Sequence, residues 1–146
     1  MSHTHSIGRL SSCITHLSHL YLTQHLQQHG LTSGQLPLLM RLYQQEGIHQ
    51  ETLAHDLLLD KTTCTRAIKK LEKAGFITKK PDPNDKRAYH LFLTPKAHAI
   101  ETQIRTILTT WRNILFNDFT SDDQHQFIIY LNRAIQNAHN HLHQKK

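Results

Sequence analysis

The feature that most constrains the fold of this chain is a change of hydrophobic period after Gly75. Before that glycine, apolar residues recur every three or four positions, which is the spacing of amphipathic helices. From Tyr89 to Leu93 the side chains alternate between two faces instead, as they do in a strand. The preceding segment, Pro81 to Lys86, is dense in turn-forming residues. We therefore expect a mainly α chain with one small β-hairpin, formed by residues 76–80 and 89–93, whose charged tip is exposed.

Six amphipathic helices are expected around this hairpin. Gly30 and Gly75 each follow a helix in the position that favours glycine. The expected N-cap residues are Thr32 (with Gln35 completing a capping box), Asp60, Thr94 and Ser121. The expected helical ranges are 7–29, 33 to about 45, 50–57, 61–74, 95–115 and 122–142. The order is thus four helices, the hairpin and two further helices, without an internal repeat.

Composition excludes several classes of protein. The chain of 146 residues is long enough to bury a core without a disulfide or a structural metal. Its longest apolar run, Phe127 to Leu131, is far shorter than the roughly 20 residues that cross a bilayer. The segment Met1 to His5 has no signal-peptide pattern, and two cysteines make no disulfide framework. We expect a cytoplasmic protein with no membrane partner.

An enzyme is the opposing functional class. The five glycines are isolated, so no phosphate-binding loop is present in the sequence. Neither a nucleophile elbow nor a His-Glu-x-x-His motif occurs. We therefore expect no catalytic residues and no cofactor.

The positive charge of the chain lies in one segment. The net charge is +6 with neutral histidines. Residues 61–96 contain ten basic residues against three acidic ones, a net charge of +7, so the remainder is nearly neutral. Charge that serves only solubility is interspersed along a chain. A contiguous basic segment favours an anionic partner such as nucleic acid.

Residues 50–57 and 61–74 have the layout of a helix-turn-helix, with a short helix, a tight turn and a longer basic helix. On a helical wheel the apolar side of the second helix comprises Cys64, Ala67, Ile68 and Leu71. The opposite side is polar at its start and cationic further along, which suits base edges first and phosphates later. Arg66 has the forked guanidinium that pairs with guanine. The candidate DNA contacts are Lys61, Thr62, Thr63, Thr65, Arg66, Lys69 and Lys73.

The hairpin tip supplies a second set of candidate DNA contacts, Asp85, Lys86 and Arg87. At positions i and i+2 of an extended strand, Asp85 and Arg87 share one face. The carboxylate is then expected to orient the guanidinium. An arginine aimed in this way can enter a minor groove, where the negative potential favours it. The alternative is a pair that only stiffens the hairpin.

Four stretches of the sequence resemble the MarR (multiple antibiotic resistance regulator) family of winged-helix transcription factors. They are Leu-Thr-Ser-Gly-Gln at 31–35, Gln-Glu-Thr-Leu-Ala at 50–54, Asp-Lys-Thr-Thr-Cys-Thr-Arg at 60–66 with Leu-Glu-Lys-Ala-Gly-Phe-Ile at 71–77, and Asp-Pro-Asn-Asp-Lys-Arg-Ala at 82–88 with Leu-Thr at 93–94. Together they correspond to the second helix, the helix-turn-helix and the wing of that family.

The resemblance implies a winged helix-turn-helix lobe at residues 31–96, flanked by dimerisation helices at 1–30 and 97–146. It implies a homodimer on pseudo-palindromic double-stranded DNA, acting mostly as a repressor of its own or neighbouring genes. It also implies release by a small phenolic or lipophilic effector, bound between the dimer lobe and the DNA-binding lobe. His16, Met40 and Trp111 are the candidate residues of that cleft.

The chain departs from the family at Leu58, where members often have glycine before the recognition helix. A left-handed backbone there costs a leucine about 1 kcal/mol. Either the leucine adopts that strained conformation or the turn has another geometry.

The cysteines and histidines allow two further interpretations. Cys64, on the inward face of its helix, is either a small buried residue or a redox switch, and Cys13 in the first helix is a second redox candidate. The 14 histidines include helical pairs that suit zinc, but we find no Cys, Asp or Glu at a fitting spacing beside them. We therefore expect no metal site. A redox- or metal-responsive regulator, or a winged helix that contacts protein, remains the alternative.

Overall fold

The computed structural model describes residues 6–144 of the chain. The segment Met1 to His5, judged above for a signal peptide, lies outside the described residues, as do residues 145 and 146. The chain divides into two compact units, one ending at Leu108 and one beginning at Thr109. Each unit is described by itself.

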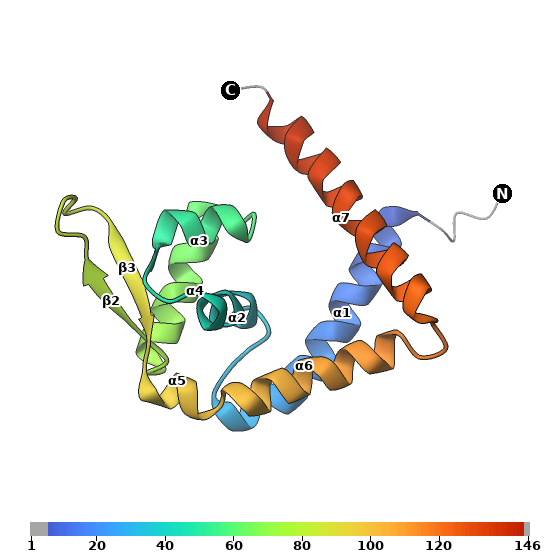
Figure 1. Ribbon diagram of the computed structural model, residues 1–146, viewed down its shortest axis with the longest axis horizontal. Helices are drawn as coiled ribbons and strands as arrows, with labels where there is room; N and C mark the ends of the chain where they lie inside the picture. Colours follow the sequence, from blue (N-terminus) through green and yellow to red (C-terminus); the bar gives the residue numbers. More distant parts are fainter. Residues whose placement is uncertain (1–5, 145–146) are drawn as a thin grey trace. The chain divides into compact units, whose positions relative to one another are not determined.

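Helices dominate the described residues, and the strands form a single small sheet (Figure 1). The first unit contains α1 (Ile7–Leu26), a short 3-10 helix η2 (Gln27–His29), α2 (Leu36–Gln44), β1 (Ile48–His49), α3 (Gln50–Asp56), α4 (Lys61–Lys73), β2 (Ile77–Pro81), β3 (Tyr89–Leu93) and α5 (Pro95–Ala99). The helix α6 (Glu101–Leu115) spans the division, and α7 (Ser121–His143) belongs to the second unit. The predicted fold class, mainly α with a β-hairpin wing, is confirmed.

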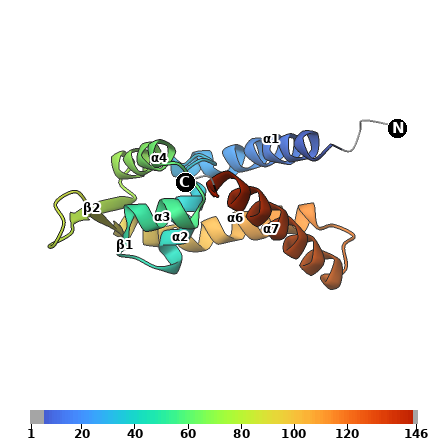
Figure 2. The ribbon, with the colours of Figure 1, turned by 90° about the horizontal axis from the view of Figure 1, so that it is seen from above.

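The sheet has three antiparallel strands in the order β1-β3-β2, rather than the two expected from the sequence. The additional strand pairs Ile48 with Leu91 and His49 with His90. It contains only two residues, so it carries no alternating pattern that the sequence could reveal. In both views the β2–β3 hairpin extends outward past α3 and α4 (Figures 1 and 2).

The core of the first unit holds the helix-turn-helix against the sheet. Leu53 of α3, Ile68 and Leu71 of α4 and Leu91 of β3 are all fully buried in one cluster. Fully buried leucine and isoleucine side chains each contribute about 1.5–3 kcal/mol of apolar transfer free energy. This packing fixes which side of α4 faces solvent.

The second helix begins later than the sequence suggested. Thr32 is not its N-cap: the side-chain oxygen of Gln35 accepts the backbone N–H of Thr32 at 2.8 Å, within a turn. The helix starts at Leu36, which places Pro37 in the first turn. Proline is tolerated there because the first-turn N–H groups have no partner within the helix.

The single helix expected over 95–115 is interrupted at Ile100, which separates α5 from α6. The Ile100 N–H donates to the carbonyl of Ala97 at 3.3 Å, a tightened turn. That carbonyl also accepts the hydroxyl of Tyr43 from α2. A side chain that inserts into the helical hydrogen-bond ladder is a recognised cause of a sharp break.

In the second unit, the last helix is capped one residue earlier than expected. The hydroxyl of Thr120, not that of Ser121, accepts the N–H of Asp123 at 3.0 Å, and the Asp123 carboxylate accepts the Thr120 N–H at 3.1 Å. Phe116, Phe119 and Phe127 bring their rings together beside this cap. No described residue of α7 is buried within the single chain.

Candidate nucleic-acid interface

Two caps set the bounds of α4, the expected recognition helix. At its start, a carboxylate oxygen of Asp60 accepts the N–H of Thr63 at 2.6 Å, as predicted for an N-cap. The side-chain hydrogen bond from Thr63, followed by this backbone contact, holds the pKa of Asp60 below its ordinary value. At its end, Gly75 has the left-handed φ of +82°, and the ammonium of Lys96 donates to the carbonyl of Ala74 at 2.6 Å. Lys96 therefore stabilises the end of the helix.

The turn between α3 and α4 keeps the left-handed geometry in spite of its leucine. Leu58 has a φ of +54°. Its N–H donates to the carbonyl of His55 at 3.1 Å, and the next N–H, of Leu59, donates to that of Ala54 at 2.9 Å. This pair of bonds is the Schellman motif, which normally has glycine at the position of Leu58. The alternative of a different turn geometry was therefore wrong.

A polar contact joins the two helices of the helix-turn-helix. The side-chain amide of Gln50, in the first turn of α3, donates to the hydroxyl of Thr65 in α4 at 2.9 Å. Thr65 is consequently half-buried, unlike its predicted neighbours on the outward face. Its hydroxyl thus holds α3 against α4.

The other candidate contacts on α4 all lie at the surface. The exposed residues are Lys61, Thr62, Thr63, Arg66, Lys69 and Lys73. The opposite side holds Cys64, Ile68 and Leu71 in the core, as the wheel predicted. A hollow of about 370 Å³ runs along the helix, lined by Lys61, Thr62, Thr65, Arg66 and Lys69. The structure thus brings most of the predicted residues together on one open face.

Two aspartates shape the wing loop through backbone contacts. Asp82 accepts the N–H of Asn84 at 2.7 Å, and Asp85 accepts the N–H of Arg87 at 2.9 Å. Residues 82–88 form turns, so the extended strand expected for Asp85 and Arg87 was wrong. Asp85 binds the backbone of Arg87 because a short Asp side chain reaches an N–H two residues on. Lys86 and Arg87 are exposed at the tip.

A second hollow, of about 400 Å³, joins the recognition helix to the wing. Lys61 and Thr65 of α4 line it together with Arg87 and Tyr89 of the wing and His49 before α3. Residues predicted separately for the helix and for the wing therefore border the same surface.

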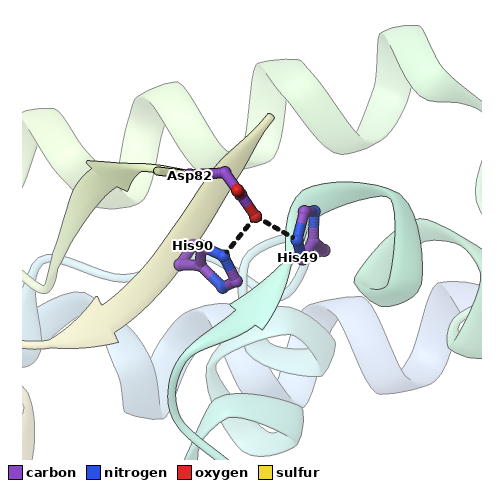
Figure 3. Close-up of side chains that lie close together, drawn as sticks. All are labelled: His49, Asp82 and His90. Carbon is purple, nitrogen blue, oxygen red and sulfur yellow. Dashed lines mark hydrogen bonds and ion pairs between the residues drawn. The ribbon is translucent and has the colours of Figure 1, made fainter. Parts of the chain in front are cut away.

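The structure also reveals a cluster at the base of the wing that sequence reasoning missed (Figure 3). One carboxylate oxygen of Asp82 lies 2.9 Å from Nε2 of His49 and 2.8 Å from Nε2 of His90. Hydrogen bonds lower the pKa of Asp82 to about 2. The largest effect comes from the backbone N–H of Asn84 and the next from the side chain of His90. The hydrogen bond to the carbonyl of Gly47, together with the weaker effect of the hydrogen bond to Asp82, raises the pKa of His90. The pairing of β1 with β3, too short to recognise in the sequence, brings the two histidines together.

The sensor candidates are placed as follows. Cys64 is buried, and burial raises the pKa of its thiol, which makes the reactive thiolate scarce. Cys13 is exposed on α1. His16 is exposed on α1, whereas Met40 of α2 packs against the core of the first unit. Trp111 is half-buried in the second unit, so a cleft formed by all three residues stays a prediction.

Comparisons with known proteins agree with this geometry. A sequence model of the MarR family matches residues 31–89. The HTH-type transcriptional regulator YybA of Bacillus subtilis is 38% identical over 107 residues, which cover 73% of this chain and 71% of that protein. This chain belongs to the MarR family. It is a transcriptional regulator, as its relatives are, and not an enzyme.

Solved structures of MarR regulators share the fold. A MarR transcriptional regulator from Methanosarcina mazei is 35% identical with a TM-score of 0.82, covering 90% of this chain and 95% of that one. A MarR family regulator from Listeria monocytogenes, solved in complex with a 26mer DNA, is 29% identical with a TM-score of 0.84, covering 92% and 89%. Within residues 6–144 of this MarR chain, no helix is long and apolar enough to cross a membrane.

Proposed function

We propose that this MarR regulator binds double-stranded DNA as a homodimer, with α4 in the major groove and the wing in the adjacent minor groove. Residues 31–96 form the DNA-binding lobe, and residues 1–30 and 97–146 supply the dimerisation helices. The observation that carries the proposal is the shared hollow, which Lys61 of α4 and Arg87 of the wing both line. One exposed cationic surface thus extends from the recognition helix to the wing.

Some cations of this segment already contact other parts of the protein, whereas others face solvent. Lys79 lies 3.9 Å from Glu72, and Lys96 donates to the end of α4. Arg66 and Lys69 line the hollow along α4 and are exposed. Side chains of this kind release counterions from DNA when they bind phosphates, which makes the affinity fall as salt rises. Arg66 also has the geometry for a bidentate contact with guanine.

The DNA proposal is tested by titrating labelled DNA from upstream of the regulator's own gene with the full chain at several salt concentrations. The expected result is tight binding at low salt, with log affinity falling linearly as log salt rises. Arg66→Ala is expected to weaken binding at least tenfold. Arg105→Ala is the matched control, because Arg105 pairs on α6 with Glu101 at 2.8 Å, outside the cationic surface. Binding that is absent at low salt or independent of salt would overturn the proposal.

Two exposed apolar faces support the homodimer. On α1, Ile7 is 81% exposed and Leu17 is 52% exposed. On α7, Tyr130 is 58% and Leu131 is 48% exposed, although the helix has a regular apolar stripe. A stable amphipathic helix buries such a stripe against another element. A second copy of the chain provides that element in the proposed assembly.

The oligomeric state is tested by sedimentation velocity on the full chain. We expect a dimer for the wild type and a shift toward monomer for Leu131→Asp, because a buried carboxylate would oppose association. Asn140→Asp, on the same helix, is the control for added negative charge. A monomeric wild type, or equal effects of the two variants, would contradict the homodimer.

Repression of its own or neighbouring genes, and release by a small phenolic or lipophilic effector, are part of the proposal and rest on the family resemblance. The burial of Cys64 disfavours a redox switch at that residue, whereas Cys13, the second redox candidate, is exposed. A reporter fused to the upstream DNA tests repression, since deletion of the regulator should raise expression. Loss of expression on deletion would indicate activation instead.

A further inference from the structure

We propose that His49, Asp82 and His90 form a binding site for a divalent transition-metal ion such as Zn²⁺, at the junction between the wing and the helix-turn-helix. The ligands would be Nε2 of each histidine and the Oδ2 oxygen of Asp82. These three atoms already lie within 4.8 Å of one another (Figure 3). None of the three ligands is among the DNA-binding residues proposed above, although His49 also lines the hollow between α4 and the wing.

The spacing of the three atoms suits a small metal ion after a minor adjustment. Zinc bonds of about 2.0–2.1 Å in a tetrahedral site place neighbouring ligand atoms about 3.4 Å apart. The two oxygen–nitrogen distances are now 2.9 and 2.8 Å, as expected when a hydrogen atom lies between each pair. A metal ion in that position requires each pair to separate by about 0.5 Å.

His90 is oriented as metal-binding histidines usually are. Its Nδ1 lies 2.8 Å from the carbonyl of Gly47. Because a carbonyl only accepts hydrogen bonds, Nδ1 carries the proton and donates. A ligating histidine typically donates its other ring N–H to a carbonyl or carboxylate, which fixes the ring and its tautomer. The metal would replace the Nε2 proton that now points at Asp82, and that proton would pass to solvent.

Each ligand is held by a different element of the fold. His49 ends β1 and is the residue before α3, His90 lies opposite it in β3, and Asp82 begins the wing loop. The side chain of Asp82 is 13% exposed, whereas those of His49 and His90 are 36% and 27% exposed. The site is therefore preformed by the sheet and still reachable by an ion, with solvent water as a fourth ligand.

The ligand set indicates the class of metal. Two imidazoles and one carboxylate favour zinc and similar first-row ions over Mg²⁺ or Ca²⁺, which prefer oxygen ligands. The register of β1 and β3, not a sequence motif, completes the set, since it brings His49 to Asp82 and His90, which lie more than 30 residues further along the chain.

Metal binding is expected to fix the wing relative to α3. Since Asp82 starts the wing loop and His49 precedes α3, a shared ion would join the two parts of the DNA surface. Binding energy rises when a contact surface is ordered beforehand. We expect Zn²⁺ to tighten DNA binding about 5-fold or more. Only this coupling rests on the proposed function.

The site is tested on the full chain, without a polyhistidine tag and freed of metal by a chelator. Titration with Co²⁺, followed by visible absorption and by displacement with Zn²⁺, is expected to show one tight site per chain. Asp82→Asn keeps the shape of the side chain and its acceptor for Asn84, and should weaken binding at least about tenfold. His49→Gln, at the most exposed ligand, is the second variant.

Other histidines supply the controls. His98→Gln removes an imidazole that also faces a carboxylate, 3.4 Å from Glu46. The double variant His139→Gln/His143→Gln removes a pair on α7 whose ring centroids lie 4.1 Å apart. Both controls should bind Co²⁺ as the wild type does. Equal affinity of wild type and Asp82→Asn, no tight binding, or loss of binding in either control would overturn the site.

The coupling is tested separately, with DNA titrations in the presence and absence of Zn²⁺. Asp82→Asn should bind DNA without a response to the ion. Metal binding with unchanged DNA affinity would refute the coupling alone, and DNA binding with no metal site would refute the site alone. The failures of the two proposals are therefore distinguishable.

Discussion

The hydroxyl of Tyr43 in α2 donates a hydrogen bond to the backbone carbonyl of Ala97 in α5 at 2.5 Å. The carbonyl belongs to the last turn before the break at Ile100, whose N–H it also accepts. Burial, followed by the charge of Glu101, raises the pKa of Tyr43 to about 12. This contact joins α5, the helix that directly follows strand β3 of the wing, to α2.

We predict that Tyr43→Phe lowers the free energy of unfolding by about 1 kcal/mol, the usual net contribution of one such hydrogen bond. Urea unfolding measures this difference. The chain has four tyrosines, and absorbance titration should show one tyrosinate forming near pH 12 in the wild type but not in the variant. Because the folded pKa exceeds the unfolded value of about 10, this contribution to stability is complete below pH 10 and declines above it. A wild-type titration in which all four tyrosinates form near pH 10 would contradict the prediction.

The helix α4 was predictable because its signals are local. Asp60 as N-cap, Gly75 after the last turn and the apolar positions Ile68 and Leu71 all act within a few residues of one another. Such signals depend on side chains and backbone of the same helix, so the outward face followed from the sequence.

The features that escaped prediction depend on contacts between distant residues. The two-residue strand at Ile48 exists only because it pairs with β3, and the break at Ile100 coincides with the contact from Tyr43. The His49–Asp82–His90 cluster depends on the same pairing. The sequence predicted a contact between the Asp85 carboxylate and the Arg87 guanidinium from their spacing in a strand. The chain turns there instead, and Asp85 accepts the backbone N–H of Arg87.

The wing provides a second prediction. Arg87→Ala should weaken binding of the upstream DNA about tenfold and reduce the salt slope by about one, because one cation at the tip is lost. Its melting temperature should change little, since the side chain is exposed. Asp85→Ala should weaken DNA binding less, because it affects Arg87 only through the turn at its backbone N–H. Fluorescence anisotropy at several salt concentrations measures both, and unchanged affinity of Arg87→Ala would refute a contact by the wing.

The strained turn before the recognition helix provides a third prediction. Leu58 adopts a φ of +54°, which costs a leucine about 1 kcal/mol relative to glycine. Leu58→Gly removes that strain but gives the unfolded chain more freedom, an opposing effect of about 0.5–1 kcal/mol. We therefore expect Leu58→Gly to leave the unfolding free energy unchanged or slightly raised. Leu57→Gly, at a φ of −94°, should lower it by about 1 kcal/mol or more. Urea unfolding of both variants measures these differences. An equal loss of unfolding free energy in the two variants would contradict the strain at Leu58.

The N-cap of the recognition helix makes stability depend on acid. Asp60 accepts the N–H of Thr63, and its pKa lies below the ordinary value because of the side-chain hydrogen bond from Thr63 and then this backbone contact. A carboxyl with a lowered folded pKa stabilises the protein above the unfolded value, about 3.9, and loses that contribution as the pH falls through the folded pKa. Asp60→Asn retains a good capping side chain without the charge. We expect the melting temperature of the wild type to fall relative to that of Asp60→Asn as the pH drops below about 4. Asp60→Ala should melt lower than both near neutral pH, because it removes the cap itself. Parallel pH profiles for wild type and Asp60→Asn would show that the Asp60 carboxylate contributes nothing specific to the folded state.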